Sequence, residues 1–154
     1  MVSAPTAQHT YTIKEAAALT GLPASTLRYY ESIGVIAPIP RGASSGHRVY
    51  DEHDLDQLMW VACLAATGMS VSDMRQYVAN GQLGASAAAE QIDLLAAQER
   101  RLALEAEHLA LRQRYVRLKI DYWHAVDAGD AERANLLAGE ARTLANALKR
   151  ARQQ

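Results

Sequence analysis

The stretch from Ala87 to Val126 contains neither proline nor glycine, the residues that most often interrupt a helix. It therefore predicts one continuous helix, about 60 Å long at roughly 1.5 Å per residue. The rest of the 154-residue chain is also rich in helix-forming residues, with only nine glycines, four prolines and no phenylalanine. We expect a mostly α-helical fold, and an all-β fold or a large multidomain enzyme is excluded.

One face of the predicted long helix carries an apolar residue at every seventh position. The series is Leu95, Leu102, Leu109, Val116 and Trp123, and Ile92, Ala106 and Ile120 lie three positions before members of it. This spacing is typical of a coiled-coil seam. The polar residues Glu99 and Gln113 occupy companion positions, so the seam is imperfect.

A second apolar row on the same helix needs a different partner. Leu104, Leu111 and Leu118 form this row. The last part of the chain, after a turn at residues 128–130, is the candidate. It carries one apolar stripe at helical spacing, made of Leu137, Ala141, Leu144, Leu148 and Ala151.

The first half of the chain predicts four short helices. Thr12 and Glu15 have the spacing of a capping box before a helix over about 13–19, and a second helix is expected over 24–32. Asp51 is the expected cap of a third helix over 53–67, and a fourth begins at Ser70. Between the second and third helices, β-prone residues flank a segment rich in proline, glycine and serine, which predicts a short hairpin over 35–50.

Basic residues outnumber acidic ones by four to two over residues 1–50, in a chain whose net charge is only −1. The second predicted helix presents small polar groups, a guanidinium and a phenol in its first turns, and the hairpin adds further basic and aromatic groups. Such side chains can contact phosphates and base edges when a helix enters the major groove of DNA. The candidate residues for nucleic-acid contact are Ser25, Thr26, Arg28, Tyr29, Arg41, His47, Arg48 and Tyr50.

Several short strings of this sequence resemble the MerR family of transcriptional regulators. They are Tyr11-Thr12-Ile13-Lys14-Glu15-Ala16-Ala17, Thr20-Gly21-Leu22, Thr26-Leu27-Arg28-Tyr29-Tyr30-Glu31, Gly34-Val35-Ile36, Pro40-Arg41, Gly46-His47-Arg48-Val49-Tyr50 and Asp54-Leu55. The resemblance covers about 11–79. It implies a winged helix-turn-helix DNA-binding domain followed by a long helix that pairs antiparallel with its twin in a homodimer.

The residue patterns and the resemblance together predict a domain organisation. We expect a flexible arm over 1–10, the DNA-binding domain over 11–80, a linker over 81–86, a dimerisation helix over 87–126 and a C-terminal helix over 127–154. Thr12 and Lys14 are added as phosphate contacts. The expected dimerisation residues are Ile92, Leu95, Leu102, Leu109, Val116, Ile120 and Trp123.

By the same resemblance, the homodimer binds a pseudo-palindromic promoter operator, and family activators bend and untwist such DNA for RNA polymerase. Two departures from the family pattern stand out. Pro23 replaces the usual capping serine before the recognition helix, and residues 62–71 lack the basic residues often found in the second wing. Because Pro23 offers no capping side chain, we expect the second helix to be held mainly by packing.

Other features bear on effectors and metals. Tyr115, Tyr122, Trp123 and His124 could line a pocket for an apolar or cationic effector, or could stabilise the coiled coil and dock the final helix. Cys63 is expected in the core. The histidines show no paired ligand spacing, so no metal site and no cofactor are predicted.

Two functions remain open. The first is a promoter-binding, homodimeric regulator, with or without an effector, and the second is an architectural or excisionase-like DNA-binding protein. Because such factors usually lack a large dimerisation arm, the long helix favours the regulator. No nucleophile–base pair or phosphate-binding glycine loop indicates an enzyme. Without a signal peptide or an apolar run of about 18 residues, a cytoplasmic protein without membrane segments is expected.

Overall fold

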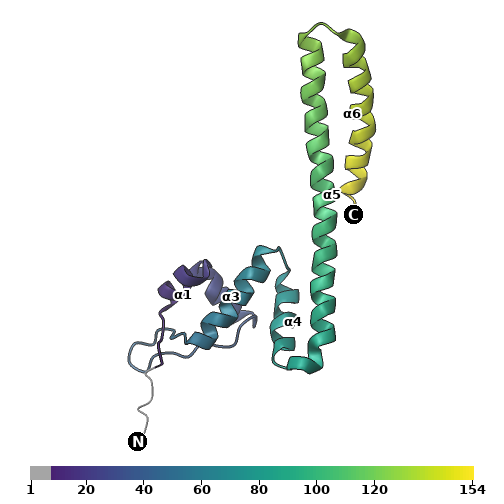
Figure 1. Cartoon of the computed structure of the whole chain (residues 1–154). Helices are drawn as coiled ribbons and strands as arrows, with labels where there is room; N and C mark the ends of the chain where they lie inside the picture. The colour runs from purple at the N-terminus through teal and green to yellow at the C-terminus, as the bar shows by residue number, and fades with distance from the viewer. Residues whose placement is uncertain (1–7) are drawn as a thin grey trace, which may run out of the picture. The chain divides into compact units, whose positions relative to one another are not determined.

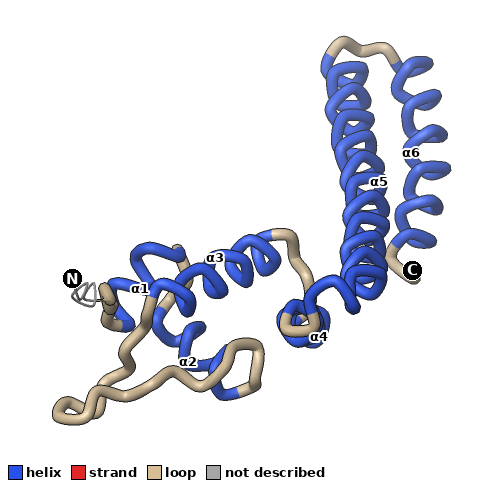
Figure 2. The backbone as a smooth tube through the Cα atoms, turned by 60° about the horizontal axis from the view of Figure 1, so that its bottom comes forward, coloured by secondary structure: helices blue, strands red, loops and turns tan. Residues whose placement is uncertain are grey.

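The computed structural model describes residues 8–154, and this part of the chain is helical and contains no strand. The prediction of a mostly α-helical fold is confirmed (Figures 1 and 2). The expected flexible arm over 1–10 lies mostly outside the described residues. The elements in chain order are α1 (Ile13–Thr20), α2 (Ala24–Ser32), α3 (Glu52–Ala66), α4 (Val71–Gly81), the single 3-10 turn η1 (Gly84–Ala87), α5 (Ala88–Asp127) and α6 (Ala131–Ala151).

The helix starts follow the capping residues in the sequence. Thr12 accepts a hydrogen bond from the Glu15 amide while the Glu15 carboxylate accepts from the Thr12 amide, which completes a capping box. Asp51 and Asp54 do the same for α3, and the Ser70 side chain caps α4. Pro23 makes no side-chain cap for α2, as predicted.

The segment between α2 and α3 is less regular than the predicted hairpin. Its pairing is reduced to one isolated antiparallel bridge between Arg41 and Arg48, and Tyr50 forms a second bridge with Tyr11. Pro38 and Pro40 precede the first bridge, and because proline has no amide hydrogen, neither can donate to a strand ladder. The result is a loop over residues 33–51 without regular strands, termed the arm below and distinct from the N-terminal arm predicted over 1–10.

The chain divides into two compact units, Met1–Leu95 and Ala96–Gln154. In the first, the apolar faces of α1, α2, α3 and α4 enclose one core with the arm. Its fully buried members include Leu27, Val35, Tyr50 and Leu58. Burying side chains of this size stabilises a small domain by about 1.5–3 kcal/mol each, and the core therefore fixes how α2 is presented.

One predicted core residue lies outside this core. Cys63 is exposed, as are its neighbours Met59 and Trp60. Leu58 and Val61 point inward, and a residue two positions beyond Val61 is rotated by about 200° around the helix axis. The expectation of a buried Cys63 was therefore wrong.

The second unit contains α6 and residues 96–127 of α5, which form a hairpin of two helices that lie side by side (Figure 1). Gly129 turns the chain with a φ of 73°, and the Asp130 side chain caps α6. Ala125, Ala134 and Leu137 are buried between the helices, with Leu118 and Tyr122 packed against them. The last helix thus covers part of the second apolar row of α5, as predicted, although Leu104 remains 40% exposed.

Candidate nucleic-acid interface

Helix α2 divides its residues between the core and the surface. Leu27 and Tyr30, three residues apart, are buried, whereas Ser25, Arg28 and Tyr29 are exposed. Because residues three and four apart share a helix face, these exposed side chains form one polar surface on the side away from the core. Thr26 is half-buried at its edge.

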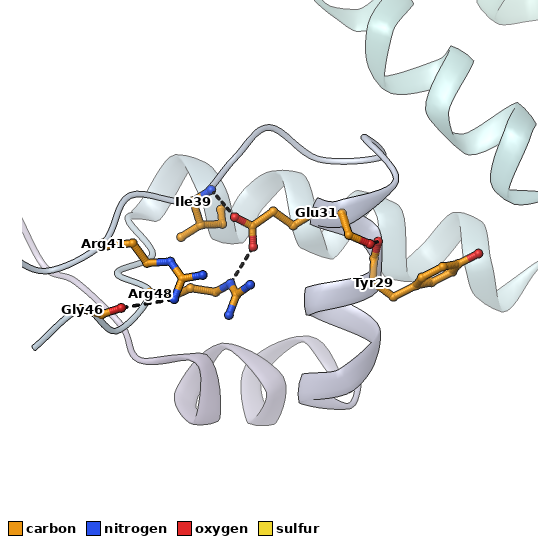
Figure 3. A network of polar contacts seen from close by, with 7 residues as sticks. Tyr29, Glu31, Ile39, Arg41, Gly46 and Arg48 are labelled. Carbon is orange, nitrogen blue, oxygen red and sulfur yellow. Dashed lines mark hydrogen bonds and ion pairs between the residues drawn. The ribbon is translucent and has the colours of Figure 1, made fainter.

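Glu31, near the end of α2, fixes the arm against that helix (Figure 3). Its carboxylate accepts a 2.6 Å hydrogen bond from Nε of Arg48 and a 2.9 Å bond from the Ile39 backbone amide. Burial alone would raise the pKa of Glu31, but the two hydrogen bonds and the charge of Arg48 outweigh it, and the pKa is lowered. The carboxylate therefore stays charged and holds two points of the arm.

The tip of the arm is closed by its own backbone. The Gly42 amide donates to the His47 carbonyl at 2.8 Å, and the Val49 amide donates to the Pro40 carbonyl at 2.8 Å. Arg41 reaches across the tip and donates from Nη1 to the Gly46 carbonyl at 3.2 Å. Arg41 and His47 are exposed. The arm thus carries a basic and an imidazole group at its surface.

The predicted contact residues differ in how far they can reach a ligand. Arg28, Tyr29, Arg41 and His47 are exposed, and Arg48 is half-buried because its Nε is engaged by Glu31. Tyr50 was predicted as a contact residue, but its exposed fraction is 0%, so its ring belongs to the core. Burial raises the pKa of the Tyr50 hydroxyl above its ordinary value, and the charges of Arg48 and Arg28 oppose this shift only in part.

Thr12 and Lys14 lie at the start of α1 and are both exposed. The Thr12 hydroxyl oxygen already accepts the Glu15 amide hydrogen at 3.2 Å, so its first role is structural.

The role of Glu31 as an anchor for a backbone amide eight residues away could not be recognised from sequence, because no spacing rule connects a helix carboxylate to a loop amide.

The predicted dimerisation residues of α5 form an exposed apolar row, here termed the seam row. Trp123 is 62% exposed and Ile92 65% exposed. The seam row consists of Ile92, Leu95, Leu102, Leu109, Val116, Ile120 and Trp123, all exposed. Rows of large apolar side chains on a soluble chain mark interaction surfaces.

The aromatic residues near the end of α5 divide between two surfaces. Tyr122 packs against the α6 contact, whereas Trp123 belongs to the seam row. Their ring centroids are 5.3 Å apart in an edge-on arrangement, and Lys119 Nζ lies 5.5 Å from the Tyr122 centroid and 5.9 Å from that of Tyr115. Tyr115, Trp123 and His124 also line an open groove along α5. They do not enclose a cavity.

Residues 8–154 hold no group of three or more histidine, cysteine, aspartate or glutamate side chains that could hold a metal ion. Over the same residues, no helix is both long enough and apolar enough to cross a membrane.

A two-helix module with a polar outer face on the second helix, flanked by a basic arm, defines the winged helix-turn-helix class. Residues 11–81 match the model of the MerR HTH family regulatory proteins. The chain is 32% identical over 112 residues to a probable heavy metal-dependent transcriptional regulator of Haemophilus influenzae, covering 73% of this chain and 84% of that protein. It belongs to the MerR family of regulators.

Two further relatives extend this comparison. The HTH-type transcriptional regulator YyaN of Bacillus subtilis is 41% identical over 71 residues, which span 46% of this chain and about half (51%) of YyaN. The crystal structure of HiNmlR, a MerR family regulator lacking the sensor domain and bound to promoter DNA, matches with a TM-score of 0.65 and 26% identity. That match covers 82% of this chain and 96% of HiNmlR. The first-half resemblance seen in the sequence is confirmed.

Proposed function

We propose that this chain is a homodimeric, sequence-specific DNA-binding regulator that acts on a pseudo-palindromic promoter operator. The observation that carries the proposal is the exposed polar face of α2, where Ser25, Arg28 and Tyr29 lie beside an arm that presents Arg41 and His47. In this proposal α2 enters the major groove and the arm contacts the neighbouring phosphates. HiNmlR, a member of the same family, was crystallised on promoter DNA, which supports this reading.

The ten residues predicted as DNA contacts take different parts in this proposal. Arg28 and Tyr29 reach base edges, Ser25 and Thr26 approach the backbone beside them, and the arm and α1 contribute phosphate contacts. Tyr50 acts from the core by holding the arm in place, because its side chain has no exposed surface. The phosphate contacts of this proposal are Thr12, Lys14, Arg41, His47 and Arg48.

The homodimer is supported by the seam row. A second copy would cover apolar side chains that α6 leaves exposed, and burial contributes about 25 cal/mol for each Å² removed from water. Charge favours an antiparallel pair. Acidic residues outnumber basic ones over 88–107, and basic residues outnumber acidic ones over 108–127, so antiparallel helices place opposite charges side by side.

The proposal has four further parts. They are promoter distortion, contact with RNA polymerase through the promoter, a cytoplasmic location and control by a small effector. Distortion requires that the two DNA-binding domains of the dimer be held at a separation that differs from that of the half-sites in relaxed DNA. Part of the binding free energy then deforms the DNA. For an effector, the groove beside Tyr115, Trp123 and His124 is the candidate, and Lys119 above the rings is the cation that such a ligand would displace.

The direct test compares Arg28→Ala with Arg142→Ala, an exposed arginine of α6 that serves as the matched control. A genome-wide footprint of the wild-type chain first supplies the operator. Arg28→Ala should abolish tight binding to this operator while the dimer remains, and Arg142→Ala should bind like the wild type. An operator footprint retained by Arg28→Ala would contradict the assignment of α2.

The seam is tested separately by Leu102→Asp. Dimer formation would bury the new carboxylate without a partner, so the dimer should dissociate. Sedimentation that still reports a dimer would place the interface elsewhere.

An architectural, excisionase-like role is the alternative function. In that case a fragment ending before Ala87 would bind the operator as tightly as the whole chain, whereas the dimeric regulator requires that the fragment lose palindromic binding.

A further inference from the structure

Two charged residues border the seam row at equivalent heptad positions. Glu105 directly precedes Ala106, which lies three positions before Leu109. In the same way, Arg112 directly precedes Gln113, which lies three positions before Val116. Both side chains are exposed on α5. Charged residues beside a coiled-coil seam form interhelical ion pairs, which set the choice of partner and the orientation of the helices.

We propose that Glu105 and Arg112 select the register in which two copies of this chain pair. The inference rests on the homodimer proposed above. In this register Ala106 faces Leu109 of the partner subunit, and Glu105 lies beside Arg112 of the partner subunit. Because a two-fold axis repeats every contact, the dimer contains this ion pair twice.

The same register satisfies the seam row. Ile92 faces Trp123 of the partner subunit, and Leu95 faces Ile120 of the partner subunit, so the outer layers are wholly apolar. The polar residues Glu99 and Gln113 each face an apolar residue, Val116 or Leu102 of the partner subunit. Neither polar residue meets its own copy, and each lies near the surface, where its polar end stays in water.

Sliding the helices by one heptad, about 10 Å, is unfavourable in both directions. In one direction Glu105 lies beside Glu105 of the partner subunit, and no opposite charge replaces the lost pair. In the other direction Arg112 lies beside Arg112 of the partner subunit. Like charges at these positions are destabilising.

The second slip is the closer competitor, because Glu105 then approaches Lys119 of the partner subunit. The contacts of the seam residues still disfavour this second register. Leu95 would face Asp127 of the partner subunit, and Glu99 would face Trp123 of the partner subunit. This register therefore loses apolar layers as well as placing the two arginines together.

The experiment uses full-length chains with reversed charges. E105R places two arginines at each contact, and R112E places two glutamates there, so each variant should form its homodimer with a dissociation constant raised about tenfold at low salt. Mixing E105R with R112E restores opposite charges at both contacts, so native mass spectrometry after subunit exchange should show mainly the heterodimer. The double variant E105R/R112E should regain the wild-type homodimer.

The matched control reverses Glu107 and Arg114, which have the same charges and the same spacing, are exposed, and lie on the helix away from the seam. E107R and R114E should form homodimers like the wild type and should mix without preference. If E105R and R112E behave as these controls do, the register is wrong while the dimer stands. If the wild-type chain itself is monomeric, the proposed function fails first.

Discussion

Replacing Glu31 by alanine should release the arm from α2, because one carboxylate holds both attachment points. The variant loses the charge-assisted bond to Arg48 and leaves the amide of Ile39, a buried residue, without its acceptor. Hydrogen bonds to charged groups contribute about 1.5–3 kcal/mol, and an unsatisfied buried donor costs about 1–3 kcal/mol. The Arg48 and Glu31 side chains are 18% and 13% exposed, so water recovers part of this loss.

We therefore expect the free energy of unfolding of the first unit to fall by about 2–4 kcal/mol in Glu31→Ala. Glu31→Gln keeps an acceptor for Ile39 but loses the charge, so the expected loss is about 1–2 kcal/mol. Each unit contains one of the two tryptophans, Trp60 and Trp123. Urea unfolding followed by Trp60 fluorescence in a Trp123→Phe background therefore reports the first unit alone.

A double-mutant cycle with Arg48→Met supplies the control. If the two side chains interact as described, the losses in Glu31→Gln and Arg48→Met should sum to more than the loss in the double variant, because both remove the same bond. Additive losses, or a loss below about 0.5 kcal/mol in Glu31→Ala, would refute the anchoring role of Glu31.

Three further outcomes are expected. Leu137→Ala should destabilise the α5–α6 hairpin by about 2–4 kcal/mol in unfolding followed by Trp123 fluorescence, whereas the neighbouring Leu136→Ala, at a 58% exposed position, should change it by less than about 0.5 kcal/mol. Thr12→Ala removes the side-chain acceptor of the α1 capping box and should cost about 1 kcal/mol by urea titration. The pKa of Glu31 is lower in the native state than in the unfolded state, so the unfolded state binds more protons at pH values between these two pKa values. The stability that Glu31 contributes should therefore be lost as the pH falls through the ordinary pKa of a glutamate and then through the native pKa of Glu31. Glu31→Gln should flatten this part of the acid unfolding profile.

Most helix boundaries could be predicted because the signals are local. Thr12, Asp51 and Ser70 each lie one residue before a helix whose first free amides they satisfy, and such bonds reach only three residues along the chain. The same locality placed the polar residues of α2 on one face. Their exposure follows from the helical period once Leu27 and Tyr30 are assigned to the core.

The arm between α2 and α3 could not be predicted in the same way. Its shape depends on contacts between residues far apart in sequence, namely Glu31 with Arg48 and Tyr11 with Tyr50. Tyr50 shows the consequence. An aromatic residue beside Arg48 in a glycine-rich segment fits a surface contact and a core anchor equally well, and only the fold of the whole unit decides that its exposed fraction is 0%.

Helix α5 carries apolar residues on two faces, and a helix of that kind needs two partners. The hairpin supplies one of them, because α6 covers Leu118, Tyr122 and Ala125. The seam row lies on another face, and α6 leaves it exposed. In the proposed homodimer, the partner of the seam row is a second copy of the chain. That second copy would satisfy both the apolar spacing and the opposite charges of the two halves of α5, so in this proposal one helix serves both the internal hairpin and the pairing of two chains.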